Sequence, residues 1–144
     1  MKILTLNTHS LVELYYEHKL SYFVEMVCKE KPEVFALQEV NQLIAAHSVL
    51  PDENYIPASG YTGVIKEDNH AYRIAELLKQ AGLTYQWSWI GAKVGYGIYD
   101  EGMALFSLNP ITATKQFYIS QNHCYSNWKT RKVLGIRTGD DPEW

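Results

Sequence analysis

Two short apolar stretches, Ile3-Leu4-Thr5-Leu6 and Val34-Phe35-Ala36-Leu37, decide the fold of this chain. The first is typical of a β-strand, and the second is continuously apolar, as buried strands of parallel sheets are. The segment between them, from about Val12 to Lys31, has the pattern of a helix that Pro32 ends. The three elements form a β-α-β unit with a right-handed crossover, so the two strands run parallel and end at the same edge of the sheet.

The helix between the strands is predicted from the spacing of its apolar residues. They recur at i, i+4, i+7, i+8 and i+11, which places them on one face: Tyr16, Leu20, Phe23, Val24 and Val27. Ser10 has the character of an N-cap, and Glu13 lies three residues later in a capping-box pattern. We therefore expect the helix to begin near residue 12.

The remainder of the chain predicts one more helix and several strands. Residues 42–69 are expected to be mostly loop, and a helix is expected over residues 71–81, with Gly82 after its end. Gly91, Gly95 and Gly97 indicate a mobile loop. Further strands are expected at Tyr85–Ile90, Met103–Ser107, Ile111–Ser120 and Thr130–Thr138.

The class predicted from this order is α/β (α+β): a β-α-β unit followed by a mostly antiparallel meander, in a single domain over residues 1–144. Two helices for about six strands cover only one face of such a sheet. We therefore expect that half of a sandwich is missing. The bare face should expose a large apolar patch that another chain covers, or the protein should associate.

Composition limits the class of protein. With 47% hydrophobic and 20% charged residues, the 144-residue chain should fold around a core. No apolar run is long enough to cross a membrane, and the N-terminus turns polar at Asn7, too early for a secretory signal. Cys28 and Cys124 fit reduced thiols and exclude a zinc site built from cysteines. We expect a cytoplasmic protein without a membrane partner.

The charge is unevenly distributed along the chain. The net charge of −3 argues against nonspecific coating of nucleic acid. From Gly102 to Gly139 there is no acidic residue, but there are five basic ones: Lys115, Lys129, Arg131, Lys132 and Arg137. Two interpretations stay open, namely ordinary charge scatter on solvated strands and a basic wall facing an anionic substrate.

Three polar residues follow the two parallel strands. Asn7 and His9 come after the first strand, and Glu39 comes after the second. Open α/β sheets bind ligands at this edge, and a carboxylate beside an amide oxygen suits a hard cation such as Mg²⁺. The other histidines, at positions 18, 47, 70 and 123, are expected to be surface or core residues.

Three blocks of sequence, Leu6–His9, Ala36–Val40 and Tyr99–Ile111, resemble the endonuclease/exonuclease/phosphatase superfamily, which has the DNase I-like fold. The strings TLNTHS, ALQEVNQ, YDEG and WKTRK most resemble the bacterial branch that includes maltose 6'-phosphate phosphatase. The resemblance covers all 144 residues but only the first half of the family's domain. It implies part of a four-layer α/β sandwich with the active site at one rim.

The resemblance also implies roles for individual residues. Glu39 corresponds to a ligand of the catalytic Mg²⁺, for which Mn²⁺ is an alternative. Asn7 corresponds to a residue that orients the phosphate and a catalytic carboxylate, and Glu101 to the acid that orients a catalytic histidine. Arg131 corresponds to a group that contacts the phosphate, and we expect it to bind substrate together with His9.

The family's later blocks have no counterpart in these residues. They are a strand with the catalytic histidine, a Gly-Asp-x-Asn block and a C-terminal Asp-His pair. The resemblance therefore implies that the 144-residue chain is inactive alone and needs a C-terminal half or a second chain. A single carboxylate ligand is expected to bind Mg²⁺ weakly.

The leading hypothesis is a Mg²⁺-dependent phosphoester hydrolase that, when complete, acts on a phosphorylated small molecule, in particular a sugar phosphate. Water attacks the phosphoester in line in this mechanism. A metal-dependent nuclease or phosphodiesterase is the enzyme alternative, and it would need a basic groove along a nucleic acid backbone. A catalytically incomplete fragment that folds without activity is the third hypothesis.

Alternatives also stay open for single residues. Glu101 is either a site residue or simply solvated. Arg131 either faces the site or pairs with Asp100 or Glu101 on a neighbouring strand. The aromatic residues of the central region either line a sugar-binding rim or belong to the core: Trp87, Trp89, Tyr96 and Tyr99.

Overall fold

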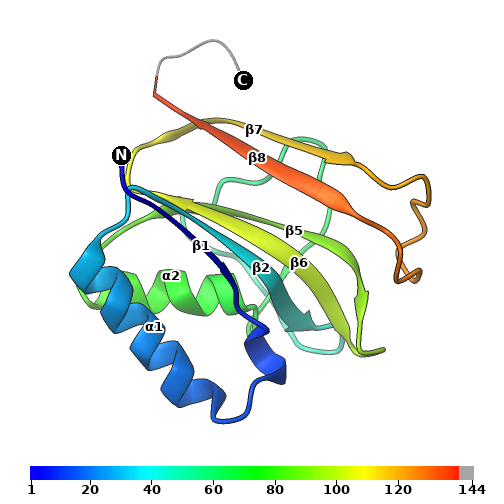
Figure 1. Ribbon diagram of the computed structural model, residues 1–144, viewed down its shortest axis with the longest axis horizontal. Helices are drawn as coiled ribbons and strands as arrows, with labels where there is room; N and C mark the ends of the chain where they lie inside the picture. Colours follow the sequence, from blue (N-terminus) through cyan, green and yellow to red (C-terminus); the bar gives the residue numbers. More distant parts are fainter. Residues whose placement is uncertain (140–144) are drawn as a thin grey trace.

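The computed structural model describes residues 1–139 and arranges them in three layers (Figure 1). Two helices lie on one face of a four-stranded sheet, and a two-stranded sheet lies on the other. The class is mixed α/β, as predicted. Residues 140–144, which the predicted domain includes, lie outside the described part.

The β-α-β unit forms as the sequence predicts. Strands β1 (Ile3–Asn7) and β2 (Val34–Leu43) pair in parallel, and helix α1 (Tyr16–Glu30) connects them. Ile3 lies opposite Val34 and Asn7 lies opposite Gln38. The C-terminal end of β1 therefore lies beside the middle of β2, at one rim of the sheet.

Helix α1 begins at Tyr16, later than the predicted start near Val12. A 3₁₀ turn, η1 (Ser10–Val12), precedes it, and Tyr15 has a left-handed backbone with φ of 58°. A non-glycine residue in that region interrupts a right-handed helix. The periodic apolar face was therefore predicted correctly, but the first turn was not.

The predicted capping box is wrong because both of its residues have other partners. The Ser10 hydroxyl accepts a hydrogen bond from the backbone N–H of Asn41 at 3.0 Å, which ties η1 to β2. The Glu13 carboxylate contacts His9 and Lys19 instead of the helix N-terminus. These contacts fix the segment that follows β1.

The four-stranded sheet has the order β1-β2-β6-β5, with β6 (Tyr99–Ser107) antiparallel to both of its neighbours. Strand β5 (Gln86–Gly95) runs through Gly91 and Gly95, which the sequence placed in a mobile loop. Those two glycines are paired with β6, and only Gly97, with φ of 74°, lies in the turn of the hairpin. The predicted loop is therefore mostly strand.

Strands β7 (Ile111–Tyr118) and β8 (Lys132–Thr138) form a sheet of their own and do not extend the meander. The backbone N–H of Ile111 donates to the Gln86 side chain at 2.7 Å just where the chain leaves the first sheet. β8 then packs across β5 and β6, with Leu134 against Ile90. The face that was predicted to be bare is thus partly covered by the chain itself.

The other part of that face, on β1 and β2, stays open in the described residues. Ile3 is 64% exposed there, but Thr5, Asn7 and Gln38 are exposed as well. The open part is therefore not uniformly apolar. Association through this face remains a prediction.

The segment between β2 and β5 is mostly irregular, as predicted, apart from the short paired strands β3 (Ser48–Val49) and β4 (Ile65–Lys66). Helix α2 (His70–Gln80) follows, and the Asn69 side chain caps it by accepting from the backbone N–H of Tyr72 at 3.0 Å. Gly82, with φ of 84°, lies just beyond its end, as expected of a helix C-terminus.

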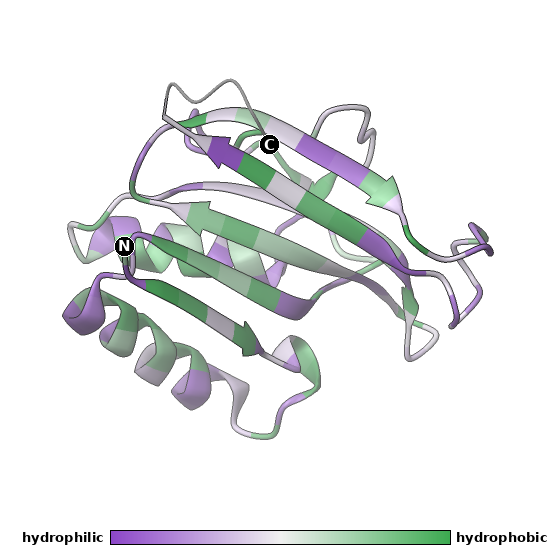
Figure 2. Cartoon of the chain, turned by 45° about the horizontal axis from the view of Figure 1, so that its top comes forward, coloured by the Kyte–Doolittle hydropathy of each residue, from purple (hydrophilic) through white to green (hydrophobic). Residues whose placement is uncertain are grey.

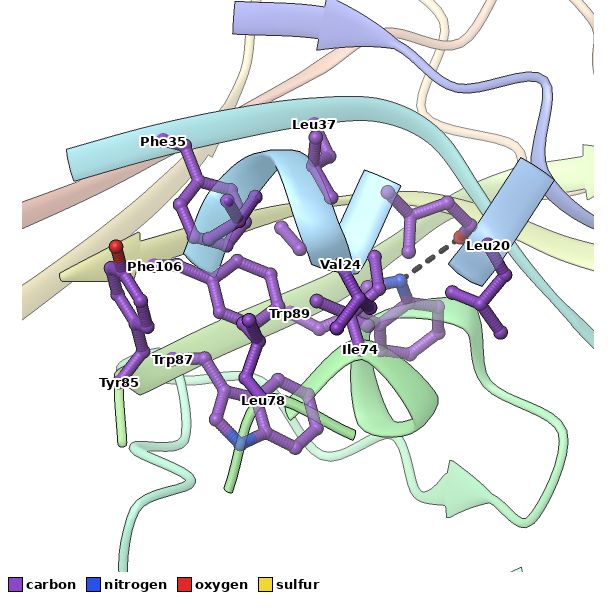
Figure 3. Close-up of a cluster of buried hydrophobic side chains, with 14 of the residues drawn as sticks. Leu20, Val24, Phe35, Leu37, Ile74, Leu78, Tyr85, Trp87, Trp89 and Phe106 are labelled. Atoms are coloured by element: carbon purple, nitrogen blue, oxygen red, sulfur yellow. Dashed lines mark hydrogen bonds between the residues drawn. The ribbon is translucent and has the colours of Figure 1, made fainter. Parts of the chain in front are cut away.

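The core lies between the helices and the sheet and is rich in aromatic side chains (Figure 3). Phe35 and Phe106 stack with ring centroids 4.3 Å apart, and Trp87 stacks on Phe106 at 6.0 Å. The indole N–H of Trp89 donates to the carbonyl oxygen of Val40 at 3.0 Å. These rings bury large apolar areas, so they hold β2, β5 and β6 in register.

The hydropathy of the residues agrees with this position of the core (Figure 2). The central strands are mostly hydrophobic, while the loop between β7 and β8 is mostly hydrophilic. Across residues 1–139, none of the helices has both the length and the apolar character needed to cross a membrane.

Gly102 is expected to be required for the sheet. A Cβ atom at this position would lie 2.0 Å from the carbonyl oxygen of Ile90, so Gly102→Ala should lower the free energy of unfolding by about 1–3 kcal/mol or more. The control is Gly97→Ala in the hairpin turn, where no atom lies within 4 Å and only the positive φ costs about 1 kcal/mol. Urea titration measures both, and an equal loss in the two variants would contradict the close approach.

Stability should depend on pH through His70, which is buried against Tyr16 with its Nδ1 2.8 Å from the phenol oxygen. Burial lowers the pKa of His70 to about 3, whereas the unfolded chain takes up this proton near pH 6.5. The unfolded state then binds more protons, so stability falls below pH 6.5 by up to about 1.4 kcal/mol per pH unit.

The measurement for His70 is the free energy of unfolding from pH 7 to pH 4 for the wild type and for His70→Gln. The wild type should lose its advantage over the variant as the pH falls. Parallel curves would show that His70 does not stay neutral in the folded protein.

Candidate functional site

The sequence suggested that Glu39 lies at the end of its strand. In the structure it lies within β2, at a β-bulge. The register with β6 shifts between Gln38 and Val40, and Glu39 has a positive φ of 53°. A bulge redirects a side chain and is common beside active sites. A non-glycine residue with this backbone is strained, and such strain is typical of functional positions.

Asn7 holds the redirected carboxylate. Its side-chain N–H donates to Glu39 Oε1 at 2.9 Å, and its Oδ1 accepts from the backbone N–H of His9 at 3.1 Å. The β-α-β topology predicts this proximity, and the structure brings the two groups into direct contact. The second oxygen of Glu39 has no hydrogen-bond partner within residues 1–139 and is free for a ligand.

A cavity of about 300 Å³ opens beside this pair, and we call it the rim cavity. Carboxylate, amide and cationic side chains from β1, β2, β5, β6 and the start of β8 line it: Asn7, Glu39, Lys93, Glu101, Arg131 and Lys132. Four of the sequence-predicted site residues therefore gather at one place. Their roles in binding or catalysis stay predictions.

Glu101 is not simply solvated. Its Oε1 lies 3.4 Å from Nζ of Lys93, and the two side chains are only 17% and 19% exposed. Gly95 leaves the room for this pair, because a Cβ at that position would lie 2.8 Å from Oε2 of Glu101. A partly desolvated ion pair of this kind fixes the orientation of the carboxylate.

Arg131 does not form the cross-strand ion pair that was one alternative. Its Nη1 donates to the backbone carbonyl oxygens of Trp128 at 2.6 Å and Thr130 at 2.9 Å. A guanidinium has five N–H donors, so this anchoring leaves several of them for an anion. Burial lowers the pKa of the neighbouring Lys132 ammonium below its usual value.

The structure does not bring His9 into the rim cavity. Its Nδ1 lies 2.7 Å from the Glu13 carboxylate, and its Nε2 lies 2.9 Å from the hydroxyl of Tyr96 in the β5–β6 hairpin. Of the aromatic residues considered for a sugar-binding rim, Trp87 and Trp89 are buried in the core. Tyr96 is exposed beside His9.

Sequence reasoning missed Lys93 as a member of the cavity. The predicted strand ended at Ile90, so Lys93 was assigned to a loop, and the polar positions of a longer strand would have been the signal. Asn41 was also missed. Its side chain is fully buried two residues after Glu39, and neither its Nδ2 nor its Oδ1 has a partner in the described chain.

The donor set fits Mg²⁺ only as a partial site. Within residues 1–139, no three His, Cys, Asp or Glu side chains gather as a metal-binding cluster. Mg²⁺ is often held by one or two carboxylates, together with waters and substrate phosphate oxygens, and Mn²⁺ accepts the same oxygen ligands. Glu39, for whose second oxygen the described residues offer no hydrogen-bond partner, meets this requirement.

One solved structure with the same fold is an endonuclease/exonuclease/phosphatase family protein from Leptotrichia buccalis C-1013-b. The TM-score is 0.84 at 27% identity, and the match covers 98% of this chain and 49% of that one. The chain thus has the DNase I-like fold and spans about half the length of that protein. No family model matches the sequence, and no curated protein matches it.

We expect the strained backbone of Glu39 at the bulge to lower the stability of the folded protein. Glu39→Gly removes the strain of a positive φ, so its free energy of unfolding should stay unchanged or rise by about 1 kcal/mol despite the lost Asn7 contact. The neighbour Gln38 has no positive φ, and Gln38→Gly should lower stability by about 0.5–1 kcal/mol. Thermal unfolding of both variants checks this, and a large loss in Glu39→Gly would contradict a strained backbone.

Proposed function

We propose that this chain carries the phosphate-binding side of a Mg²⁺-dependent phosphoester hydrolase. The observation that supports it most is the gathering of the Asn7–Glu39 pair, Glu101 and Arg131 around the rim cavity. Mixed charge is what such a reaction needs, since carboxylates hold a cation while arginine and lysine attract the phosphate. The likeness to an endonuclease/exonuclease/phosphatase family protein supports the same reaction class.

In this proposal the tasks are divided among the groups that line the rim cavity. The free N–H groups of Arg131 and the Lys132 ammonium bind phosphate oxygens. Asn7 keeps the Glu39 carboxylate directed toward the cavity through its 2.9 Å hydrogen bond. Glu39 would hold Mg²⁺, which when bound supplies Lewis-acid polarisation of the phosphoester. Glu101 is kept in place by Lys93 and orients a further catalytic group.

The groups that activate water are proposed to come from elsewhere. No histidine or aspartate lines the rim cavity among residues 1–139. The chain matches 49% of a longer protein, which supports the idea that the remaining groups lie in a further segment or a second chain. A folded but catalytically incomplete 144-residue chain is consistent with this.

The substrate proposed is a sugar phosphate rather than a nucleic acid. The net charge of −3 and the resemblance to the branch that includes maltose 6'-phosphate phosphatase support this choice. A nuclease would need basic side chains that follow a nucleic acid backbone. A cytoplasmic protein, with the two cysteines as free thiols, is part of the proposal.

The test is phosphate release by the natural gene product that contains this chain, with Mg²⁺ and with chelator. We expect Mg²⁺-dependent hydrolysis of a sugar 6-phosphate that exceeds hydrolysis of DNA. Glu39→Gln should reduce the rate by roughly 100-fold, because removal of a metal-binding carboxylate weakens metal affinity and activity. Glu25→Gln, an exposed change on α1, is the matched control and should leave the rate unchanged.

The 144-residue chain alone should release little phosphate in the same assay. Fast turnover by a monodisperse monomer of this chain would contradict the proposal that further groups are needed. Faster cleavage of DNA than of sugar phosphates would favour the nuclease. Activity that is insensitive to chelator would contradict the metal dependence.

A further inference from the structure

A second cavity, of about 480 Å³, shares the Lys132 side chain with the rim cavity. Strands β2, β5, β6 and β8 contribute to both, and Lys132 lines both. Asp100 lines the second cavity and Glu101 lines the rim cavity, as expected of successive residues of one strand, whose side chains point to opposite faces of the sheet. The two cavities meet at Lys132, so a ligand that extends past this side chain can occupy both.

Asp100 presents a charged acceptor to the second cavity. Its Oδ1 accepts from the Tyr125 hydroxyl at 2.8 Å, and its Oδ2 accepts from the Gln42 side-chain N–H at 2.9 Å. Each oxygen accepts one hydrogen bond from a neutral donor, so both oxygens have further lone pairs for a ligand. Burial and the contact with Asp100 raise the pKa of Tyr125, so this phenol remains a donor.

The hydrogen bond from Gln42, a side chain that is only 1% exposed, fixes the position of Asp100. The Gln42 Nε2 also donates to the Val64 carbonyl oxygen at 3.0 Å. Its Oε1 accepts from the backbone N–H of Lys66 and from the Asn69 side chain, both at 2.9 Å. A buried network in which each group has partners holds a binding residue in one orientation before the ligand arrives.

Two further residues that line the second cavity, Lys132 and Tyr61, contribute hydrogen-bond donors and an aromatic ring. Lys132 Nζ donates to the Gln116 side chain at 2.9 Å, which leaves other N–H groups for a ligand. The Tyr61 hydroxyl accepts from the backbone N–H of Gly91 at 2.9 Å and keeps its own proton available. Burial raises the pKa of Tyr61, so this proton is retained at neutral pH.

These observations select one ligand chemistry. A fixed carboxylate in a cavity that is also lined by hydroxyl and ammonium donors and by the rings of Tyr61 and Tyr125 matches a neutral polyhydroxylated molecule. The carboxylate disfavours a second phosphate group. We infer that the second cavity binds the sugar portion of the substrate through Asp100 while its phosphate occupies the rim cavity. This inference rests on the proposed function.

Binding without turnover tests the inference on the 144-residue chain itself. Amide NMR spectra are recorded during separate titrations with maltose and with inorganic phosphate. Maltose should shift the amide signals of Thr62, Gly63 and Gly91 around the second cavity. Inorganic phosphate should instead shift those of Lys93 and Arg131 around the rim cavity.

Asp100→Asn should weaken maltose binding about tenfold or more, because hydrogen bonds to a charged acceptor are lost. It should leave phosphate binding within about twofold, since the rim cavity keeps its own groups. Tyr125→Phe, which removes one donor to Asp100 but keeps the ring, should weaken maltose binding less. The matched control is Asp52→Asn, whose carboxylate pairs with Lys79 outside both cavities.

Maltose shifts confined to the second cavity and lost in Asp100→Asn support the inference. Absence of maltose shifts in the wild type, or shifts elsewhere in the chain, overturns it, and neither result depends on how a variant folds. Phosphate shifts at the rim cavity without maltose binding would reject the sugar site and keep the proposed phosphate site. Maltose binding without phosphate binding would keep the sugar site in the second cavity and would reject the proposed phosphate site in the rim cavity.

Discussion

The parallel pairing of β1 with β2 is the constraint on which the rest of the site depends. It sets Asn7 opposite Gln38, one residue before the bulge that turns Glu39 toward the rim. A shift of one residue would move alternate side chains to the other face of the sheet and separate the amide from the carboxylate. The buried rings of Phe35, Phe106 and Trp87 hold that register from the side of the helices.

The rim joins two kinds of electrostatic environment. Around Glu39 and Arg131 the side chains are partly exposed, and each keeps free atoms toward solvent. Around Glu101 and Asp100 the carboxylates are fixed by partners from β5, β2 and the β7–β8 loop. Fixed acceptors beside available cations suit recognition of a molecule with one anionic end and one neutral end.

Much of the fold could be predicted from local patterns. The parallel strands, the periodic face of α1 and the C-terminus of α2 follow from apolar spacing, proline and glycine. The start of α1 could not, because tertiary contacts of Ser10 and Glu13 replaced the capping box. The separation of β7 and β8 into a second sheet depends on contacts far apart in sequence, such as Leu134 with Ile90.

The site was predictable where topology alone brings residues together, as for Asn7 and Glu39. Glu101 and Arg131 were named from a resemblance, and the cavity beside Glu39 contains both. His9 follows the same strand but bonds Glu13 and Tyr96, because the left-handed backbone after β1 turns the chain away. No pattern in the sequence shows the bulge, which depends on the pairing of β2 with β6.

The most direct test of the central claim is paramagnetic broadening by Mn²⁺ in amide NMR spectra of the chain with inorganic phosphate present. A metal held at Glu39 beside a phosphate at Arg131 predicts that signals around the rim cavity, those of Asn7, Glu39 and Arg131, broaden first. Glu39→Gln should remove that local broadening. Broadening centred elsewhere in the chain, or unchanged by Glu39→Gln, would contradict the account.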